Sequence, residues 1–171
     1  MATANKTLSL EEFRTHYGGR KPHFEYWFGE AVQKPMPTWL HAVLQGILIE
    51  FLKRAGYKAG SELELRIDPD WRPVPDVAGL SESPETSYPT RPVDIVIEVL
   101  SPDDDLGRVT EKCRQYARIG ILKIFLADPV ERKAWEWKRS TQQRELVDVF
   151  ALPNGRSIAL ADVWDELAKQ L

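Results

Sequence analysis

The most constraining feature of this sequence is the segment VDIVIEVL, residues 93–100, which is β-branched and apolar apart from two acidic residues. Such a run is typical of a central strand that is covered on both faces. A helix is predicted next, over residues 106–119, and a second buried strand in ILKIFLADP, residues 121–129. Strand, helix and strand in this order form a βαβ unit, so the two strands should be parallel with a right-handed crossover.

Further elements are predicted around this unit. Residues 23–34 alternate aromatic and polar side chains around Gly29, which predicts a β-hairpin. Residues 39–55 carry apolar side chains at helical spacing behind the N-cap candidate Thr38. The other predicted elements are strands at residues 62–67, 74–80, 133–138 and 145–150 and a helix at residues 160–171. We therefore expect an α/β fold with a mixed central β-sheet flanked by helices, in the order α-β-β-β-α-β after an N-terminal hairpin.

The chain length of 171 residues predicts one domain. We expect a polar lead-in at residues 1–22, with a helical turn capped by Ser9, and a single domain at residues 23–171. The lead-in lacks an apolar core of signal-peptide length, and no apolar stretch is long enough to cross a membrane. Cys113 is the single cysteine, which excludes an internal disulfide and fits a reducing, cytoplasmic location.

The charge balance excludes one class of function. The chain has 23 basic and 26 acidic residues, a net charge of −3. A protein that coats nucleic acid by neutralising phosphates usually has a basic excess, so that role is excluded. A nuclease with a local basic groove is not excluded by this charge, because metal-binding carboxylates lower the net charge of such a protein.

Two carboxylates are candidates for chemistry. Strand alternation places Val96, Glu98 and Leu100 on one face, and a lone buried Glu98 would be costly unless it is paired or bound to a cation. Glu98 also stands near the carboxyl end of its strand, where open sheets place ligand sites. Together with Asp76 it would form the oxygen-rich site that Mg²⁺ or Mn²⁺ prefers, completed by water and a backbone carbonyl. Each residue also has an alternative interpretation. Glu98 could reach water or an arginine at the strand end, and Asp76 could mark a turn or the entry to a strand.

Lys112 flanks the apolar face of the predicted helix 106–119, which Val109, Cys113 and Tyr116 form. Its ammonium either reaches solvent while its stem covers the core, or turns toward the strand ends near Glu98.

Several motifs in a fixed order resemble a known family. They are PDV (75–77), DIVIEVLSP (94–102), Lys112 with Tyr116, ARIG (117–120), and a strand ending in ADP (127–129). This order is similar to that of the Uma-type branch of the PD-(D/E)XK nuclease superfamily, a large bacterial group of restriction endonucleases. Residues 23–44 also match the opening hairpin and first helix of the group, with Gly29–Glu30 and His41 at its Gly-Glu and histidine places.

The resemblance implies a restriction-endonuclease-like core and a role for each matching residue. Asp76, Glu98 and the backbone of Val99 would be metal ligands. Leu100 stands where the superfamily pattern has lysine, and Lys112 would supply that lysine from the following helix, to orient or activate water and to stabilise negative charge.

Glu30 would be the additional acid that contacts the metal, directly or through water, with Glu25 as a neighbouring competitor. His41 stands beside apolar helix positions, and a packed or hydrogen-bonded histidine is the alternative to a functional one.

The implied activity is Mg²⁺-dependent hydrolysis of phosphodiester bonds in a nucleic acid, with DNA favoured, Mn²⁺ as a substitute and a homodimer as the expected assembly. The alternatives are a catalytically inactive nuclease-fold scaffold and a small-molecule phosphoesterase that uses the same metal site. Two features oppose the nuclease interpretation: basic residues are scattered, and the acidic run 103–105 would repel phosphate unless it caps the next helix or faces away. Trp135 and Trp137 share a strand face and predict core or dimer contacts.

Overall fold

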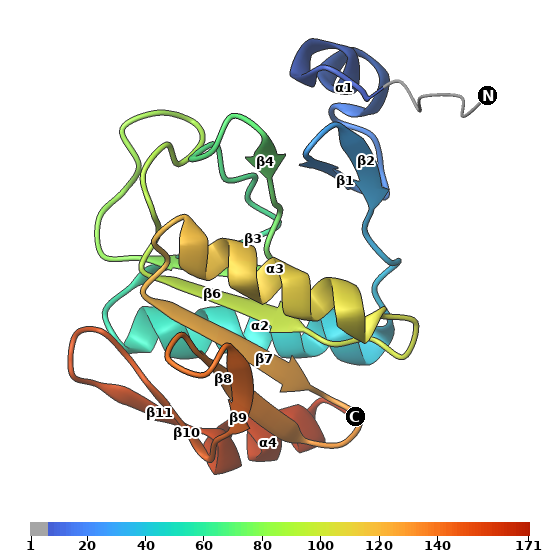
Figure 1. Ribbon diagram of the computed structural model, residues 1–171. Coiled ribbons are helices and arrows are strands. Elements are labelled where there is room, and N and C mark those ends of the chain that lie inside the picture. Colours follow the sequence, from blue (N-terminus) through green and yellow to red (C-terminus); the bar gives the residue numbers. More distant parts are fainter. Residues whose placement is uncertain (1–6) are drawn as a thin grey trace.

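A computed structural model describes residues 7–171 of the chain (Figure 1). Residues 1–6 of the predicted lead-in lie outside the described residues. Among the described residues, no helix combines the length and the apolar character that a membrane crossing requires.

The main sheet has six strands in the order β3-β5-β6-β7-β8-β9. These strands are β3 (Lys58–Ser61), β5 (Val77–Leu80), β6 (Ile95–Val99), β7 (Lys123–Asp128), β8 (Lys133–Lys138) and β9 (Gln143–Leu146). Strands β6 and β7 are parallel and are joined by α3 (Leu106–Arg118), whereas the other neighbours are antiparallel. The predicted βαβ unit and mixed sheet are therefore confirmed.

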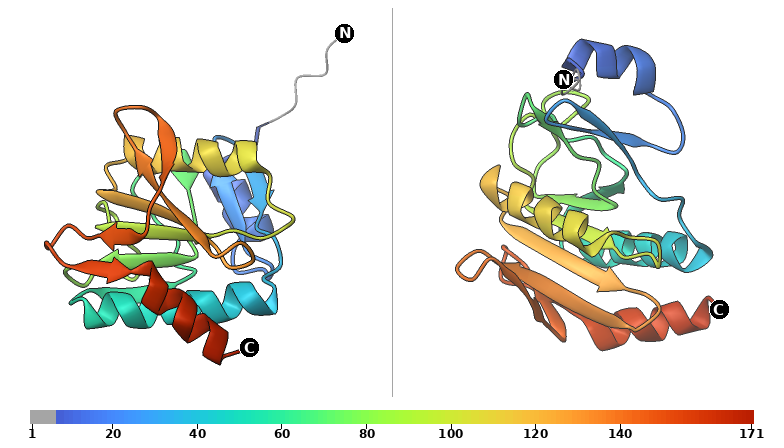
Figure 2. Two further views of the ribbon diagram at one scale, coloured as in Figure 1. Left: turned by 90° about the horizontal axis from the view of Figure 1, so that it is seen from below. Right: turned by 45° about the vertical axis from the view of Figure 1, so that its right-hand side comes forward.

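Helices cover both faces of this sheet. Helices α2 (Trp39–Arg54) and α4 (Leu160–Lys169) lie on one face, and α3 lies on the other (Figure 2, left). Alternating residues of β6 follow this division: Ile95 and Ile97 pack in the core under α2 and α4, and Val96 packs in the core under α3. Glu98 therefore points toward the α3 side, as strand alternation predicted.

A smaller sheet lies beside the main one (Figure 1). It consists of β1 (Phe24–Trp27), β2 (Glu30–Gln33) and β4 (Trp71–Arg72), and β1 and β2 form the predicted hairpin. The Trp71 ring contacts both Trp27 and Tyr116 of α3, with ring centroids 5.8 and 5.1 Å apart. Aromatic packing thus joins the small sheet to α3.

The lead-in holds a full helix, α1 (Leu10–Tyr17), where the sequence predicts one turn. Ser9 caps it in a capping box with Glu12, and Phe13 packs against Tyr26 of β1 with ring centroids 5.3 Å apart. The helix therefore rests on the hairpin.

Two predicted strands are wrong. Residues 62–67 form no strand, because Glu62 takes a left-handed backbone (φ 54°) that ends β3. The predicted strand at residues 145–150 is divided: β9 ends at Leu146, and β10 (Val149–Ala151) pairs with β11 (Ser157–Ala159) in a separate two-stranded sheet.

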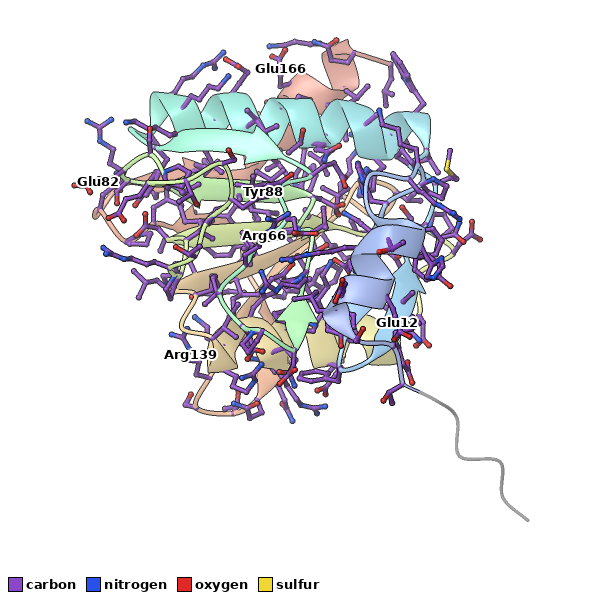
Figure 3. The ribbon with its side chains drawn as sticks, turned by 90° about the horizontal axis from the view of Figure 1, so that it is seen from above. Glu12, Arg66, Glu82, Tyr88, Arg139 and Glu166 are labelled. Atoms are coloured by element: carbon purple, nitrogen blue, oxygen red, sulfur yellow. The ribbon has the colours of Figure 1, made fainter. Side chains whose placement is uncertain are left out.

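The long loop between β5 and β6 is fixed to the segment before β4. Figure 3 shows Arg66 and Tyr88 side by side, and the Arg66 guanidinium lies 3.5 Å from the Tyr88 ring centroid. The backbone N–H of Arg66 also donates to the Pro89 carbonyl over 2.8 Å. A cation–π contact and a backbone hydrogen bond therefore anchor this loop.

Candidate functional site

A cavity of about 710 Å³ opens between the hairpin, the start of α2, the loop 101–105 and the first turns of α3. Asp76, Glu98 and Lys112 all line this cavity. Asp76 is 4% and Glu98 is 7% exposed, so both carboxylates lie at depth. The structure thus brings together three of the residues that the sequence proposed for chemistry.

Asp76, directly before β5, is held as a carboxylate by several donors. Its Oδ1 accepts from Lys34 Nζ over 2.8 Å, its Oδ2 accepts from the Val99 N–H over 2.8 Å, and Oδ2 lies 3.2 Å from His41 Nε2. Burial disfavours the charge, but Lys34 and His41 outweigh it and keep the pKa of Asp76 well below its usual range. The same contact raises the pKa of His41 against the effect of burial. Asp76 is therefore ionised at any physiological pH.

Lys34 is fully engaged in the protein. Its Nζ donates to Asp76 Oδ1, to Glu62 Oε2 over 3.0 Å and to the Val74 carbonyl over 2.7 Å. An ammonium has three N–H donors, so none of them is left for a ligand. Gln45 closes the group by donating from Nε2 to the Asp76 carbonyl over 2.6 Å and to Glu62 Oε1 over 3.2 Å.

Lys112 sits between two carboxylates. Its Nζ lies 2.7 Å from Glu25 Oε1 and 2.9 Å from Glu98 Oε1. The Tyr116 hydroxyl also donates to Glu98 Oε1, over 2.6 Å. These contacts use two of the three ammonium donors, and within the described residues neither the third donor nor Glu98 Oε2 has a partner.

The charges of this pair are set by burial and by each other. Burial is the largest effect on Glu98 and raises its pKa to about 7, although Lys112 acts in the opposite direction. Burial also opposes the charge of Lys112, but Glu25 and Glu98 outweigh it and raise its pKa, so the ammonium stays protonated.

Glu25 lies in this ion-paired cluster, and Glu30 does not. Glu25 Oε1 also accepts from the Val74 N–H over 2.7 Å, and its Oε2 accepts from Trp27 Nε1 over 3.0 Å. Glu30 is the cross-strand partner of Trp27 at the turn end of the hairpin, on the same face of the hairpin as Glu25. The Glu30 side chain is exposed and does not line the cavity. The structure therefore does not bring Glu30 to the other acids.

The acidic run 103–105 lines the cavity but is partly used for local structure. Asp105 caps α3 by accepting from the N–H groups of Gly107 and Arg108 over 2.9 and 3.3 Å. Asp104 Oδ2 accepts from the Ser101 N–H over 2.6 Å. These bonds reduce the repulsion that the sequence leads one to expect.

Comparison with known proteins shows the family and the fold of this chain. The family model Uma2, described as a putative restriction endonuclease, matches residues 10–168. The chain belongs to the Uma2 family. A crystal structure of a putative nuclease belonging to DUF820 from Anabaena variabilis ATCC 29413 has the same fold, with a TM-score of 0.80 and 24% sequence identity over 94% of this chain and 99% of that one. No curated protein matches the sequence.

In this Uma2 chain, the sequence alone did not predict that Lys34, Gln45 and Glu62 belong to the site. Lys34 ends the hairpin segment, and Gln45 lies one helical turn after His41 on the same face of α2, which would have indicated Gln45. Cys113 is buried, and burial raises its pKa to about 12. Trp137 lies in the core, one of the two placements that the sequence predicts for it. Cys113 is therefore a packing residue.

Proposed function

We propose that this Uma2 protein is a metal-dependent endonuclease that hydrolyses phosphodiester bonds, with DNA as the favoured substrate. The observation that carries the proposal is the meeting of Asp76, Glu98 and Lys112 in one deep cavity. The ion-paired cluster contains the carboxylates of Glu25, Glu62, Asp76 and Glu98 and the ammonium groups of Lys34 and Lys112. Even when His41 beside Asp76 is protonated, these four carboxylates outnumber the three cationic groups once Glu98 is ionised, and this excess of negative charge favours a further cation.

The donors suit a hard cation. Within residues 7–171 no group of three His, Cys, Asp or Glu side chains could enclose a metal ion. Mg²⁺ does not need such a cage, because it keeps several waters and is usually bound through one or two carboxylates. Glu98 Oε2 has no partner among the described residues, and Asp76 Oδ1 has a single one. We propose that Asp76, Glu98 and the Val99 carbonyl hold Mg²⁺, with Mn²⁺ as a substitute.

The protein groups then have distinct tasks. A bound Mg²⁺ would supply Lewis-acid activation of the phosphate and of the attacking water. Lys112, whose ammonium stays protonated, donates its third N–H to the phosphate and stabilises the negative charge that develops there. Tyr116 and Lys112 both hold Glu98 Oε1, which leaves Oε2 without a partner among the described residues and available to the metal.

A matched pair of variants tests this function. Glu98→Gln keeps the shape of the side chain and removes its charge. Glu136→Gln is the control, because Glu136 is also buried on the main sheet and also ion-paired, with Lys123 Nζ at 2.7 Å and Lys138 Nζ at 2.8 Å, but does not line the cavity. Mn²⁺ binding is measured by calorimetry, and cleavage is measured on circular plasmid and circular single-stranded DNA.

We expect wild type and Glu136→Gln to bind Mn²⁺ and to cut DNA, and Glu98→Gln to do neither. Wild type that binds no metal and cuts nothing would contradict the enzyme proposal and favour a nuclease-fold scaffold. Metal binding with hydrolysis of bis(p-nitrophenyl) phosphate, but with no cleavage of any nucleic acid, would favour a small-molecule phosphoesterase.

Two accompanying proposals concern assembly and location. We propose a homodimer, because β9 is an open edge strand with Leu146 60% exposed. The single buried cysteine supports a cytoplasmic location as a further proposal.

A further inference from the structure

Two basic residues at the rim of the cavity have no carboxylate partner. Arg108 of α3 and Lys21, which precedes β1, both line the cavity and are exposed. Among the described residues, neither side chain makes an ion pair or a hydrogen bond. Lys34 and Lys112, by contrast, are held by carboxylates. The two rim cations are therefore available to an anion that enters from outside.

Arg108 is held at the cavity wall without losing its hydrogen-bond donors. Its guanidinium lies 5.7 Å from the Trp27 ring centroid, and Trp27 lines the same cavity. A cation–π contact positions a guanidinium but gives its N–H groups no oxygen partner. Asp105 accepts from the backbone N–H of Arg108 and not from its side chain. A planar guanidinium with free N–H groups suits two oxygens of a phosphate.

Arg108 also stands in line with Lys112. The two residues are four positions apart on α3, so they share a face of the helix and lie about 6 Å apart along its axis. Lys112 is buried beside Glu98, whereas Arg108 is exposed. The pair therefore leads from the proposed catalytic carboxylate to the rim. A strand whose scissile phosphate reaches Lys112 would bring a neighbouring phosphate toward Arg108.

The free cations favour a polymer as the substrate. A small diester has one phosphate, which the metal and Lys112 would hold, so Arg108 and Lys21 would be left without an anion. The acidic run 103–105 also lines the cavity and repels phosphates, so a nucleic acid strand needs unpaired cations at this rim. Arg108 and Lys21 supply them from two different elements.

We propose that Arg108 and Lys21 bind the backbone phosphates next to the scissile one, so that the site recognises a polynucleotide chain and not a small phosphodiester. The assignment rests on the proposed function for its chemistry. Its binding part stands on the two unpaired cations and needs no metal.

Binding measured without metal tests the proposal separately from catalysis. Fluorescence anisotropy in EDTA compares labelled duplex and single-stranded DNA of one sequence over a range of salt concentrations. The logarithm of the association constant falls with the logarithm of the salt concentration, by about 0.9 for each phosphate contact on a duplex and about 0.7 on a single strand. Arg108→Gln and Lys21→Gln should each reduce this slope by about one contact and weaken binding at low salt by about tenfold.

Arg114→Gln is the matched control. Arg114 is an arginine of the same helix, but it pairs with Glu111 over 3.3 Å and does not line the cavity. This variant should keep the salt slope and bind DNA within about twofold of wild type. Arg108→Lys should also keep the slope, because the positive charge remains, and a merely structural role for Arg108 would not give this rescue.

Catalysis gives a second readout. In Arg108→Gln, kcat/KM on an oligonucleotide should fall at least about fivefold more than kcat/KM on bis(p-nitrophenyl) phosphate, because the small diester has no neighbouring phosphate.

Unchanged salt slopes in Arg108→Gln and Lys21→Gln, or an equal loss in Arg114→Gln, would overturn the proposal, and so would a wild type that binds no DNA. Failure of the proposed function has a different signature: wild type binds no Mn²⁺ and hydrolyses nothing, while the differences in anisotropy between the variants remain.

Discussion

Lys34 and Lys112 differ by one free hydrogen-bond donor, and this difference separates their roles. Lys34 donates all three of its ammonium N–H groups to protein oxygens, whereas Lys112 donates only two. Lys34 therefore positions Asp76, and Lys112 can reach a substrate.

We expect Lys112→Gln to lower kcat by about 10²–10³-fold while Mn²⁺ affinity changes little, because the lost donor acts on the phosphate in the transition state. Lys34→Gln should instead weaken Mn²⁺ binding, because Asp76 loses the cation that fixes Oδ1. Calorimetric Mn²⁺ titration and steady-state kinetics on both variants measure the two effects. A normal kcat in Lys112→Gln would rule out its proposed role.

Burial of Glu98 makes stability depend on pH. Its pKa rises from 4.5 when unfolded to about 7 when folded, so the folded protein holds the extra proton between these values. The stabilisation is present below pH 4.5 and is lost as the pH rises through about 7. Between about pH 5.5 and pH 8, Glu98 should cost the metal-free protein about 2 kcal/mol of its free energy of unfolding.

Urea denaturation of wild type and Glu98→Gln in EDTA at these two pH values measures this loss. The variant should lack the Glu98 contribution, and parallel pH dependence in the two proteins would show that Glu98 does not titrate in this range.

Sequence reasoning could find Asp76, Glu98 and Lys112 because a charged residue in or beside an apolar strand or helix face stands out. It could not find Lys34 or Glu62 as partners, since Lys34 meets Asp76 across 42 positions of chain and neither residue interrupts an apolar pattern. The position of Glu30 illustrates the same limit. Glu25 and Glu30 share a face of the hairpin, and only the packing of the hairpin on the sheet decides which one enters the cavity.

At the scale of elements, α3 depends on its first turn. Asp105 caps the helix that carries Arg108, Lys112 and Tyr116. Asp105→Ala should therefore reduce the free energy of unfolding by about 1 kcal/mol. Asp103→Ala is the matched control, because no side-chain hydrogen bond of Asp103 exists among the described residues. Chemical denaturation of the two variants measures this difference, and equal losses would mean that the cap does not stabilise α3.

The predictions for elements succeeded where periodicity and end signals agreed. Helices α2 and α3 and strand β8 lie within one residue of their predicted bounds. Residues 62–67 alternate like a strand, but Glu62 turns the backbone so that its side chain meets Lys34 and Gln45. Tertiary contacts there outweigh local propensity.

At the scale of the whole molecule, the open edge at β9 predicts self-association. We expect a homodimer at micromolar concentration in sedimentation velocity. Leu146→Lys should give a monomer, because a lysine on an edge strand opposes pairing with another copy. Leu122→Lys, on a similarly exposed residue (55% against 60%) that precedes β7 and is not part of β9, should remain dimeric. A monomeric wild type would remove this prediction.

The residues around the cavity belong to two different sheets, and this division has a consequence for thermal inactivation. Glu25 lies on β1 of the small sheet and Lys34 directly follows β2, whereas Asp76 directly precedes β5 and Glu98 lies on β6 of the main sheet. A three-stranded unit held by ring contacts can open locally at a lower free energy than the six-stranded core. The proposed nuclease activity should therefore disappear on heating several degrees before the far-UV circular dichroism signal of the main sheet, because the protein passes through a folded but inactive state. Coincident curves would show one cooperative unit.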